Sequence, residues 1–402
     1  MTILFGHPSG NPNSHHAALA HFEAGWLEAF CVPWIPSAAT VSILAHAPRL
    51  RALAERLSRR RFAPLARAPT VQGRAGEWRR LAIRALGRGD EGLSYEANDW
   101  LMETMRRECS RPDVRAVHAY EDCSLLQFRE ARRRGQACVY DMPIGYYPAW
   151  LEREKRLLER YADWLPAEGL AASRFVRPAQ KDEELALADC VLAPSEFVAG
   201  TIRRFHPHKN VQLARYGVEA DLWTPAPDKA RDGPLRFLFV GQCSLRKGVP
   251  LLLEAWTSAG LRDATLELVG GWRLAEHKKT LPAGVRWTGP VDRAALARRY
   301  READVFVFPT YFEGRALVVG EALASGLPVI TTRESGAEDL VDQTTGILLE
   351  GHETEELIHA LRWFSENRNR LVELSVGARS AAEASSWSAY REAVKAATRR
   401  YA

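Results

Sequence analysis

Short apolar runs alternate along the chain with longer stretches of helical periodicity. The first run, Thr2–Phe5, ends in turn-forming residues, and Ser14 then precedes an alanine- and leucine-rich stretch as a predicted helix N-cap. Later runs predict strands at 117–120, 137–140 and 190–193, with helices at 124–134, within 149–188 and after 194–196. Strands and helices that alternate with these lengths predict a doubly wound parallel sheet.

A second series of alternating elements follows residues 216–235, where charges and prolines interrupt the periodicity. It predicts strands at 237–240, 265–269, 285–288, 305–308, 329–330 and 346–349, with helices near 249–259, 293–301 and 317–325. We therefore predict an α/β protein with two Rossmann-like domains, residues 1–216 and 217–385, and a terminal helix at 386–402.

Length and composition agree with this division. A chain of 402 residues is too long for one ordinary core, and its 46% apolar and 26% charged residues are typical of a soluble globular protein. No apolar run reaches the roughly 18–20 residues that span a bilayer, and the N-terminus reads as a strand rather than a signal peptide. Six scattered cysteines without a Cys-x-x-Cys pair predict free thiols in a reducing cytoplasm.

Charge is distributed unevenly. Residues 1–90 hold twelve arginines and no lysine against five acidic residues. Within them, the Arg-, Ala- and Leu-rich stretch 46–88 predicts one or two basic amphipathic helices. Peripheral contact with an anionic membrane, at its inner face, is one interpretation, and a solvated helix face is the other. No nucleic-acid-binding module is recognisable, so we expect no nucleic-acid partner.

The segment Phe239–Gly248 carries the clearest binding motif. Gly241 ends a strand, and Arg246 and Lys247 stand where the next helix should begin. A glycine at a strand end lets a ligand approach the backbone, and paired cations can neutralise a diphosphate. A solvated basic turn is the alternative.

A second motif begins at Asp304 and contains the predicted strand 305–308, which stops at Pro309. A loop and a helix follow, with carboxylates at Glu313 and Glu321. The unpaired amides at the start of that helix form an anion site. Glu313 is placed to bind sugar hydroxyls and Glu321 to bind a ribose, whereas a helix-start carboxylate and a surface ion pair are the respective alternatives.

The two carboxylates, with seven residues between them, stand before the segment 322–329 and resemble the signature of family 4 glycosyltransferases. Similar stretches are 189–197, 216–219, 241–248, 335–339 and Ser386-Trp387. The resemblance is specific over 189–350 and weaker over 1–188. It implies a GT-B fold, in which two Rossmann-like domains face each other across a cleft and the C-terminal helix returns to the first domain.

The resemblance also implies a reaction: retaining transfer of a sugar from a UDP- or GDP-sugar to a hydroxyl acceptor, such as a glycan, a lipid-linked glycan or a small molecule. Arg246 and Lys247 would hold the diphosphate, Glu313 the donor sugar and Glu321 the ribose. The implied donor-binding set is Gly241, Gln242, Ser244, Arg246, Lys247, Gly289, Pro290, Val291, Glu313, Gly314, Arg315, Ala316, Leu317 and Glu321. The chain lacks an Asp-x-Asp motif, so we expect neither metal nor cofactor.

Two residues depart from the family pattern. The family usually has arginine where this chain has Gln242, which removes one phosphate cation that Arg246 would replace. It usually has an aromatic residue where this chain has Arg315. An extra cation there predicts an acidic group on the donor or acceptor, and a solvent-facing arginine is the alternative.

The first domain would bind the acceptor. The family commonly has a histidine near the position of Asp141, which joins Glu313, Lys247 and Arg246 in the predicted catalytic set because a carboxylate can orient the acceptor or take its proton. The donor phosphate is the alternative base. The acceptor-binding candidates, all near strand ends, are His7, Gly10, Asn11, Asn13, His15, His16, His118, Glu121 and Asp141. For any single histidine a structural role is the alternative.

Other functions remain open from the sequence. A phosphorylase or a nucleotide-sugar epimerase would use the same fold, and a non-catalytic scaffold would keep the nucleotide site without turnover. A nicotinamide dehydrogenase is disfavoured because no Gly-x-Gly-x-x-Gly follows a strand.

Overall fold

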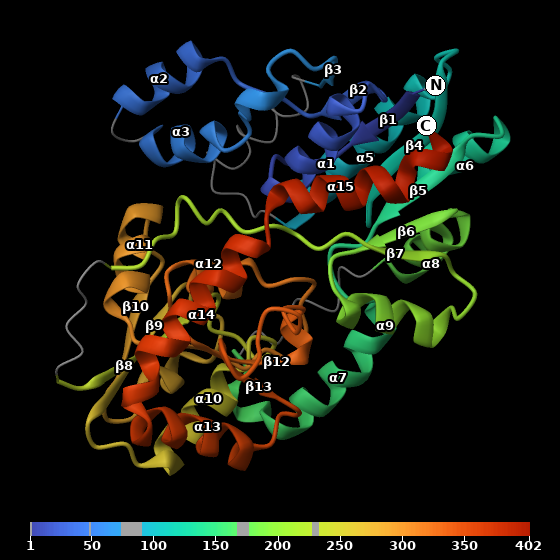
Figure 1. Ribbon diagram of the computed structural model, residues 1–402. Helices are drawn as coiled ribbons and strands as arrows, with labels where there is room; N and C mark the ends of the chain where they lie inside the picture. Colours follow the sequence, from blue (N-terminus) through green and yellow to red (C-terminus); the bar gives the residue numbers. More distant parts are fainter. Residues whose placement is uncertain (1, 48–49, 74–90, 167–176, 227–232) are drawn as a thin grey trace.

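The computed structural model describes residues 2–47, 50–73, 91–166, 177–226 and 233–402, which form two α/β domains (Figure 1). Each described domain is built on one sheet in which all paired strands are parallel. Structure and sequence agree on the predicted fold class, including the terminal helix that returns to the first domain.

The first domain contains a seven-stranded sheet among the described residues, in the order β3-β2-β1-β4-β5-β6-β7. Its strands are β1 (Thr2–Gly6), β2 (Leu27–Val32), β3 (Thr70–Gln72), β4 (Val114–Tyr120), β5 (Ala137–Asp141), β6 (Cys190–Ala193) and β7 (Val211–Leu213). Its helices are α1 (Pro12–Glu23), α2 (Ala38–His46), α3 (Arg51–Ser58), α5 (Glu91–Glu108), α6 (Leu125–Arg133), α8 (Pro178–Leu187) and α9 (Glu196–Phe205).

The second domain contains a six-stranded sheet in the order β10-β9-β8-β11-β12-β13. Its strands are β8 (Leu235–Val240), β9 (Ala264–Val269), β10 (Val285–Gly289), β11 (Val305–Phe308), β12 (Val329–Thr332) and β13 (Gly346–Leu349). Its helices are α10 (Val249–Ala259), α11 (Arg293–Glu302), α12 (Leu317–Ala324), α13 (Thr354–Glu366) and α14 (Leu371–Ala384). The strands are buried apolar runs, as expected for a sheet covered on both faces.

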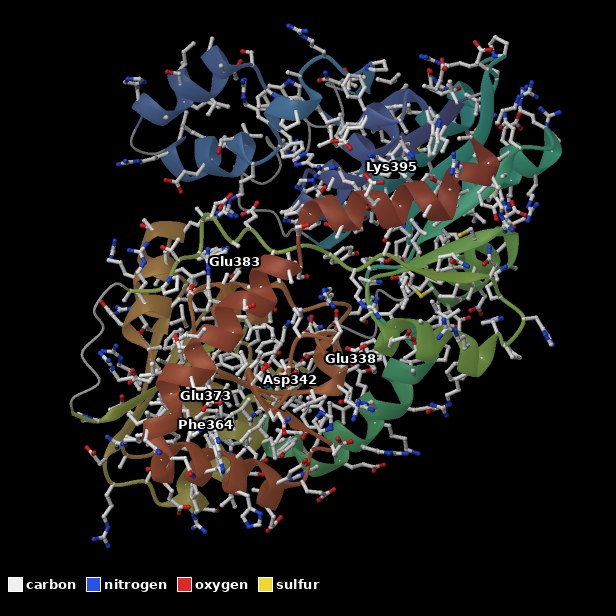
Figure 2. All side chains as sticks on the ribbon, viewed as in Figure 1. Glu338, Asp342, Phe364, Glu373, Glu383 and Lys395 are labelled. Carbon is white, nitrogen blue, oxygen red and sulfur yellow. The ribbon has the colours of Figure 1, made fainter. Side chains whose placement is uncertain are left out.

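The final helix, α15 (Trp387–Thr398), packs on the first domain beside α1 (Figure 1). Tyr390 and Val394 join the core of the first domain. Lys395, labelled in Figure 2, pairs with Glu23 of α1 at 2.9 Å. The two segments that cross between the domains also meet, because the Val218 amide donates to the Ser385 carbonyl at 2.8 Å.

Helix α7 (Tyr147–Arg160) falls in the first half of the chain but packs on the second domain (Figure 1). Leu157 and Tyr161 belong to the core of the second domain. The Tyr161 hydroxyl donates to Glu254 at 3.1 Å, and the Trp164 carbonyl accepts the Ala275 amide at 2.9 Å. A domain boundary at residue 216 therefore places α7 in the first domain, although this helix packs on the second domain.

Several local predictions were wrong. The N-cap of α1 is Asn11, whose side chain accepts the Ser14 amide, so the helix begins three residues before the predicted position. The stretch 46–88 is not simply helical: α3 ends at Ser58, Pro64 and Pro69 interrupt the chain, and Thr70–Gln72 pairs with β2 as a strand. The rest of that prediction, residues 74–90, lies outside the described residues.

None of the described helices is both long and apolar enough to cross a bilayer.

Candidate active site

The loop Gly241–Gly248 joins β8 to α10 at the carboxyl edge of the second sheet. It interlocks with the segment after β11, because a Cβ atom on Gly248 would lie 1.9 Å from the Pro309 carbonyl oxygen. Gly248 also has φ +74°, which favours glycine. The Tyr311 amide and the Thr310 hydroxyl both donate to the Arg246 carbonyl, at 2.8 and 3.0 Å. The two sequence motifs are thus one structural unit.

Arg246, Lys247 and Glu313 meet at this edge. Arg246 Nη1 lies 2.7 Å from Glu313 Oε1, and Lys247 Nζ pairs with the same oxygen. Lys247 Nζ also lies 5.1 Å from the centre of the Phe308 ring, and burial lowers the pKa of Lys247. Two cations share one carboxylate, so the cluster has positive charge to offer a bound anion.

Glu321 lies on α12, the helix that directly follows the loop carrying Glu313. Its carboxylate accepts the Tyr300 hydroxyl at 3.0 Å, and burial raises the pKa of Glu321 to about 7. Arg293 and Glu219 lie near enough to act on its charge in opposite directions. The sequence did not indicate Tyr300 as a partner of Glu321, because the two residues are 21 positions apart and meet only in the folded domain.

Three residues of the predicted donor-binding set lie at the end of β10 and just after it: Gly289, Pro290 and Val291. The Gly289 carbonyl accepts the Gly270 amide at 2.9 Å, and Val291 packs against the core of the second domain. Gln242 is exposed at the end of β8, and the hydroxyl of Ser244 accepts the Lys247 amide at 3.4 Å. The strands β10, β9, β8 and β11 are neighbours in this order. The predicted donor residues, which follow β10, β8 and β11, therefore extend along the carboxyl edge of the second sheet.

Not all of the predicted backbone donors are free. The Ala316 amide donates to the Ser335 carbonyl at 2.8 Å, so its assignment to a phosphate or sugar is wrong for this conformation. Leu317 opens α12. Gly314 is pressed against the first domain, because a Cβ atom there would lie 1.7 Å from the Pro143 carbonyl oxygen.

Arg315 contradicts both expectations for its side chain. It neither faces solvent nor extends toward a ligand, and only 3% of the side chain is exposed. Its guanidinium pairs with Asp339 at 2.5 Å, donates to the Tyr216 and Gly336 carbonyls, each at 3.1 Å, and reaches the Ser385 hydroxyl at 3.4 Å. Buried carbonyls and one carboxylate satisfy the cation, which therefore ties the second domain to both crossing segments.

Asp141 lies at the end of β5 but is 2% exposed. Burial raises the pKa of Asp141 to about 8, although the nearby hydroxyls of Tyr120 and Tyr216 act in the opposite direction. The carboxyl group is therefore mostly protonated at neutral pH. This burial and the raised pKa of Asp141 argue against its predicted role in taking the acceptor proton.

His118 is also enclosed. It is fully buried, burial lowers the pKa of His118 to about 3, and its Nδ1 lies 2.9 Å from His21 Nε2. Its Nε2 lies 3.8 Å from Asp141 Oδ2. Since no surface of the ring reaches solvent, His118 is wrong as an acceptor-contacting residue in this conformation.

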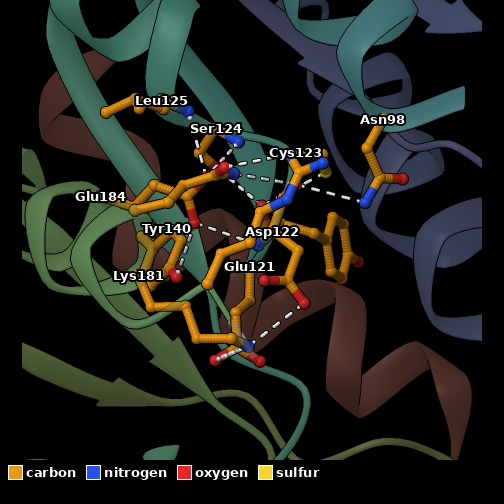
Figure 3. Close-up of polar contacts among 12 residues, drawn as sticks. Asn98, Glu121, Asp122, Cys123, Ser124, Leu125, Tyr140, Lys181 and Glu184 are labelled. Carbon is orange, nitrogen blue, oxygen red and sulfur yellow. Dashed lines mark hydrogen bonds and ion pairs between the residues drawn. The ribbon is translucent and has the colours of Figure 1, made fainter. Parts of the chain in front are cut away.

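Glu121 belongs to a polar cluster at the end of β4 (Figure 3). Lys181 pairs with Glu121 at 2.8 Å and with Asp122 at 3.1 Å, and only 5% of the Glu121 side chain is exposed. Glu184 accepts the amides of Ser124 and Asp122 at 2.9 and 3.0 Å, and so caps α6 (Figure 3). The ion pair and the burial contradict an acceptor contact for Glu121.

The remaining acceptor candidates surround α1. Asn11 caps the helix, and Asn13 Nδ2 donates to the Tyr216 hydroxyl at 3.3 Å. Gly10 lies against Arg60, since a Cβ atom on Gly10 would be 2.8 Å from its Cα atom. These residues lie beyond β1, as predicted, but their polar groups serve the fold.

The histidines of this region stack on aromatic rings. His15 stacks on Phe62 with 5.1 Å between ring centres, and His16 stacks on Trp387 at 4.4 Å. His7 meets the ring of Tyr120 edge-on at 4.5 Å. Burial lowers the pKa of each of the three histidines to about 4, so the imidazoles are neutral at pH 7.

A cavity of about 530 Å³ lies between the two domains. Its walls come from α7, α9 and the segment 333–338, together with Phe312. Glu338, labelled in Figure 2, accepts the Phe197 amide at 3.1 Å across this interface. None of the predicted donor or acceptor residues lines this cavity.

All six cysteines are buried as free thiols. Within the described ranges, no group of three or more His, Cys, Asp or Glu side chains is arranged to hold a metal ion.

Comparisons with known proteins agree with the motif at 241–321. The family described as "Glycosyl transferases group 1" matches residues 234–367. A D-inositol 3-phosphate glycosyltransferase of Nocardia farcinica is 31% identical over 245 residues, which are 59% of this chain and 48% of that protein. A GDP-mannose-dependent alpha-mannosyltransferase of Corynebacterium glutamicum is 29% identical over 188 residues, 46% of this chain and 42% of that protein. The chain spans about half the length of the curated relatives it matches.

Solved structures share the whole fold at low identity. The sucrose-phosphate synthase of Thermosynechococcus elongatus has a TM-score of 0.67 at 19% identity, with 100% of this chain and 98% of that one covered. Anabaena HepE in complex with UDP has a TM-score of 0.62 at 14% identity, with both chains covered fully. These likenesses show that the chain has the GT-B fold, and the model of the glycosyl transferases group 1 family matches a segment of its second domain.

Proposed function

We propose that this protein transfers a glycosyl group from a UDP- or GDP-sugar to a hydroxyl acceptor with retention at the anomeric carbon. The observation that carries the proposal is the convergence of Arg246, Lys247 and Glu313 at the carboxyl edge of the second sheet. Ligands of open parallel sheets bind at this edge. Relatives named as glycosyltransferases support the same reaction class.

In the proposed reaction, the bond between the anomeric carbon and the diphosphate oxygen breaks while the acceptor oxygen bonds to the same face of that carbon. Negative charge grows on the leaving diphosphate, and Arg246 and Lys247 stabilise it by turning from Glu313 to the phosphates. Glu313 then accepts hydrogen bonds from the donor sugar. The two cations supply this charge without a metal ion.

The acceptor hydroxyl must lose a proton. Because Asp141 is buried and mostly protonated at neutral pH, we assign the proton to an oxygen of the departing diphosphate. Glu321 is assigned to the ribose, since it lies on the helix that begins just after the Glu313 loop.

A nucleotide screen tests the donor site. Calorimetry and thermal shift with UDP, GDP, ADP and dTDP, each with and without magnesium, should give saturable binding of UDP or GDP that does not depend on magnesium. Binding of none of the four by folded protein would refute the proposed donor. Release of free sugar phosphate, or epimerised nucleotide sugar, would instead identify a phosphorylase or an epimerase, and binding without turnover would identify a scaffold.

Peripheral contact with an anionic membrane is proposed for α2 and α3 together rather than for all of residues 46–88. Helix α2 has no buried residue, and Ile43 is 71% exposed. Exposed Arg51 at the start of α3 and exposed Arg59 just after its end supply the positive charge. An apolar helix beside cations is suited to the surface of an anionic bilayer.

Sedimentation with vesicles tests this contact. Vesicles containing phosphatidylglycerol should retain the protein, and Ile43→Ser should release it. Val376→Ser, which changes an equally exposed valine on α14, is the matched control and should bind as the wild type does. Equal binding to neutral vesicles, or retention of Ile43→Ser, would refute the contact.

A further inference from the structure

The loop that carries Glu313, residues 309–316, is held by hydrogen bonds to its carbonyl groups. The Thr310 carbonyl accepts the Thr332 hydroxyl at 2.6 Å and His352 Nε2 at 2.9 Å. The Phe312 carbonyl accepts Arg246 Nη1 at 2.7 Å. These donors belong to the second domain, so they fix the loop to its own sheet.

Two further donors come from the first half of the chain. Arg153 Nη1, on α7, donates to the Tyr311 carbonyl at 3.1 Å, and the Ser195 hydroxyl, at the N-cap of α9, donates to the Gly314 carbonyl at 2.6 Å. Glu334 holds Arg153 in place by an ion pair of 2.7 Å. The backbone on both sides of Glu313 is thus tied to helices that precede the second domain in sequence.

Side-chain packing fixes the same residues. The Phe312 ring lies between Trp150 of α7 and Phe197 of α9, with ring centres 5.4 and 5.3 Å away. Gly145 lies close to the same ring, since a Cβ atom there would be 2.5 Å from it. Glu313 therefore stands between Phe312 and Gly314, two residues that the first half of the chain immobilises.

This anchoring matters when a donor binds. Without a donor, Arg246 and Lys247 both hold the Glu313 carboxylate. A diphosphate would compete for those cations, and the position of Glu313 would then depend on its backbone. Misplacement of a reacting group by about 1 Å is enough to cost on the order of 100-fold in rate.

We propose that Arg153 is a positioning residue for Glu313, acting through the Tyr311 carbonyl, so that α7 is part of the donor site although it lies in the first half of the chain. The inference rests on the proposed function. It assigns Arg153 no contact with the substrate, and it predicts an effect on turnover rather than on nucleotide affinity.

The test compares three variants of the full chain. Arg153→Met keeps the aliphatic stem and removes the donor, and should lower kcat by about 10- to 100-fold. The KM for the donor and the Kd for the nucleotide should stay within about 3-fold, because the phosphate cations are untouched. Arg153→Lys retains one donor and should recover most of the rate. Arg204→Met is the control, since Arg204 lines the same cavity but pairs with Glu152.

The outcomes separate the two proposals. A wild-type protein that binds no nucleotide overturns the donor site and the inference together. An active wild type with unchanged kcat in Arg153→Met, or with a loss equal to that of Arg204→Met, overturns the inference alone. If Arg153→Met does not fold, Glu334→Gln, which removes the ion pair that holds Arg153, should lower kcat with an unchanged Kd, and an unchanged kcat would overturn the inference.

Discussion

Replacement of Arg315 by methionine distinguishes a structural arginine from one that binds substrate. The guanidinium donates to two buried carbonyls, pairs with Asp339 and reaches Ser385. Methionine fills much of the same volume but satisfies none of these groups. The change would loosen the second domain from the Tyr216 and Ser385 segments, where the chain crosses between domains.

The expected cost follows from burial. Removing one partner of a buried ion pair typically costs about 3–5 kcal/mol. The side chain of Arg315 is 3% exposed and that of Asp339 is 29% exposed, and Asp339 keeps a second partner in Arg215 at 3.3 Å. We therefore expect the lower end, about 3 kcal/mol. For a domain of this size, that loss lowers Tm by about 6–12 °C.

Scanning calorimetry, followed by turnover measured per folded molecule, is the assay. Arg215→Met is the matched control, because it removes a 40% exposed partner of the same carboxylate and should cost no more than about 1 kcal/mol. A Tm for Arg315→Met no lower than that of Arg215→Met would refute the structural role. An unchanged Tm with a 100-fold loss of turnover would restore the role at the donor or acceptor that the sequence suggested.

Four further predictions concern the proposed site. Glu313→Gln should abolish transfer while leaving the fold intact, and wild-type turnover would remove its contact with the sugar. Lys247→Ala should weaken nucleotide binding by about 10-fold or more, from a charge-assisted bond of about 1.5–3 kcal/mol, and an unchanged Kd by calorimetry would contradict this role. Asp141→Asn should keep turnover within about 3-fold at pH 7, because the buried carboxyl is already mostly protonated, and a 100-fold loss would revive the base. Because folding raises the pKa of Glu321, its stabilising contribution is fully present below about pH 4.5 and is lost as the pH rises through about 7. The Tm of Glu321→Gln minus the Tm of the wild type should therefore rise between pH 5 and pH 8. A difference that stays constant with pH would contradict the burial of Glu321.

The predictable parts of this structure are those whose signal is local. The alternating apolar runs revealed both parallel sheets, because each central strand is buried on both faces. The strands β2, β3 and β7 were not predicted. Two of them, β3 and β7, are short edge strands with partly exposed residues, so they lack that apolar signature.

The same distinction separates the two kinds of site residue. Arg246, Lys247 and Glu313 were found from short motifs at strand ends. Arg153 and Ser195 were missed, because they reach the Glu313 loop from 158 and 119 residues away in sequence. Arg315 was misjudged for a related reason: its partners Tyr216 and Asp339 lie 99 and 24 residues away in sequence and contact it only in the folded chain.

The placement of α7 has a consequence for synthesis on the ribosome. Its apolar residue Leu157, with Tyr161 and Trp164 just after the helix, leaves the exit tunnel well before the β8–β13 sheet that covers this face. All strands of the first sheet have therefore been synthesised while this face still lacks its cover, and exposed apolar surface of this kind is prone to aggregation. We expect nascent chains that stop near residue 216 to bind chaperones more strongly than the full chain does, and ribosome-bound chains of the two lengths provide the comparison.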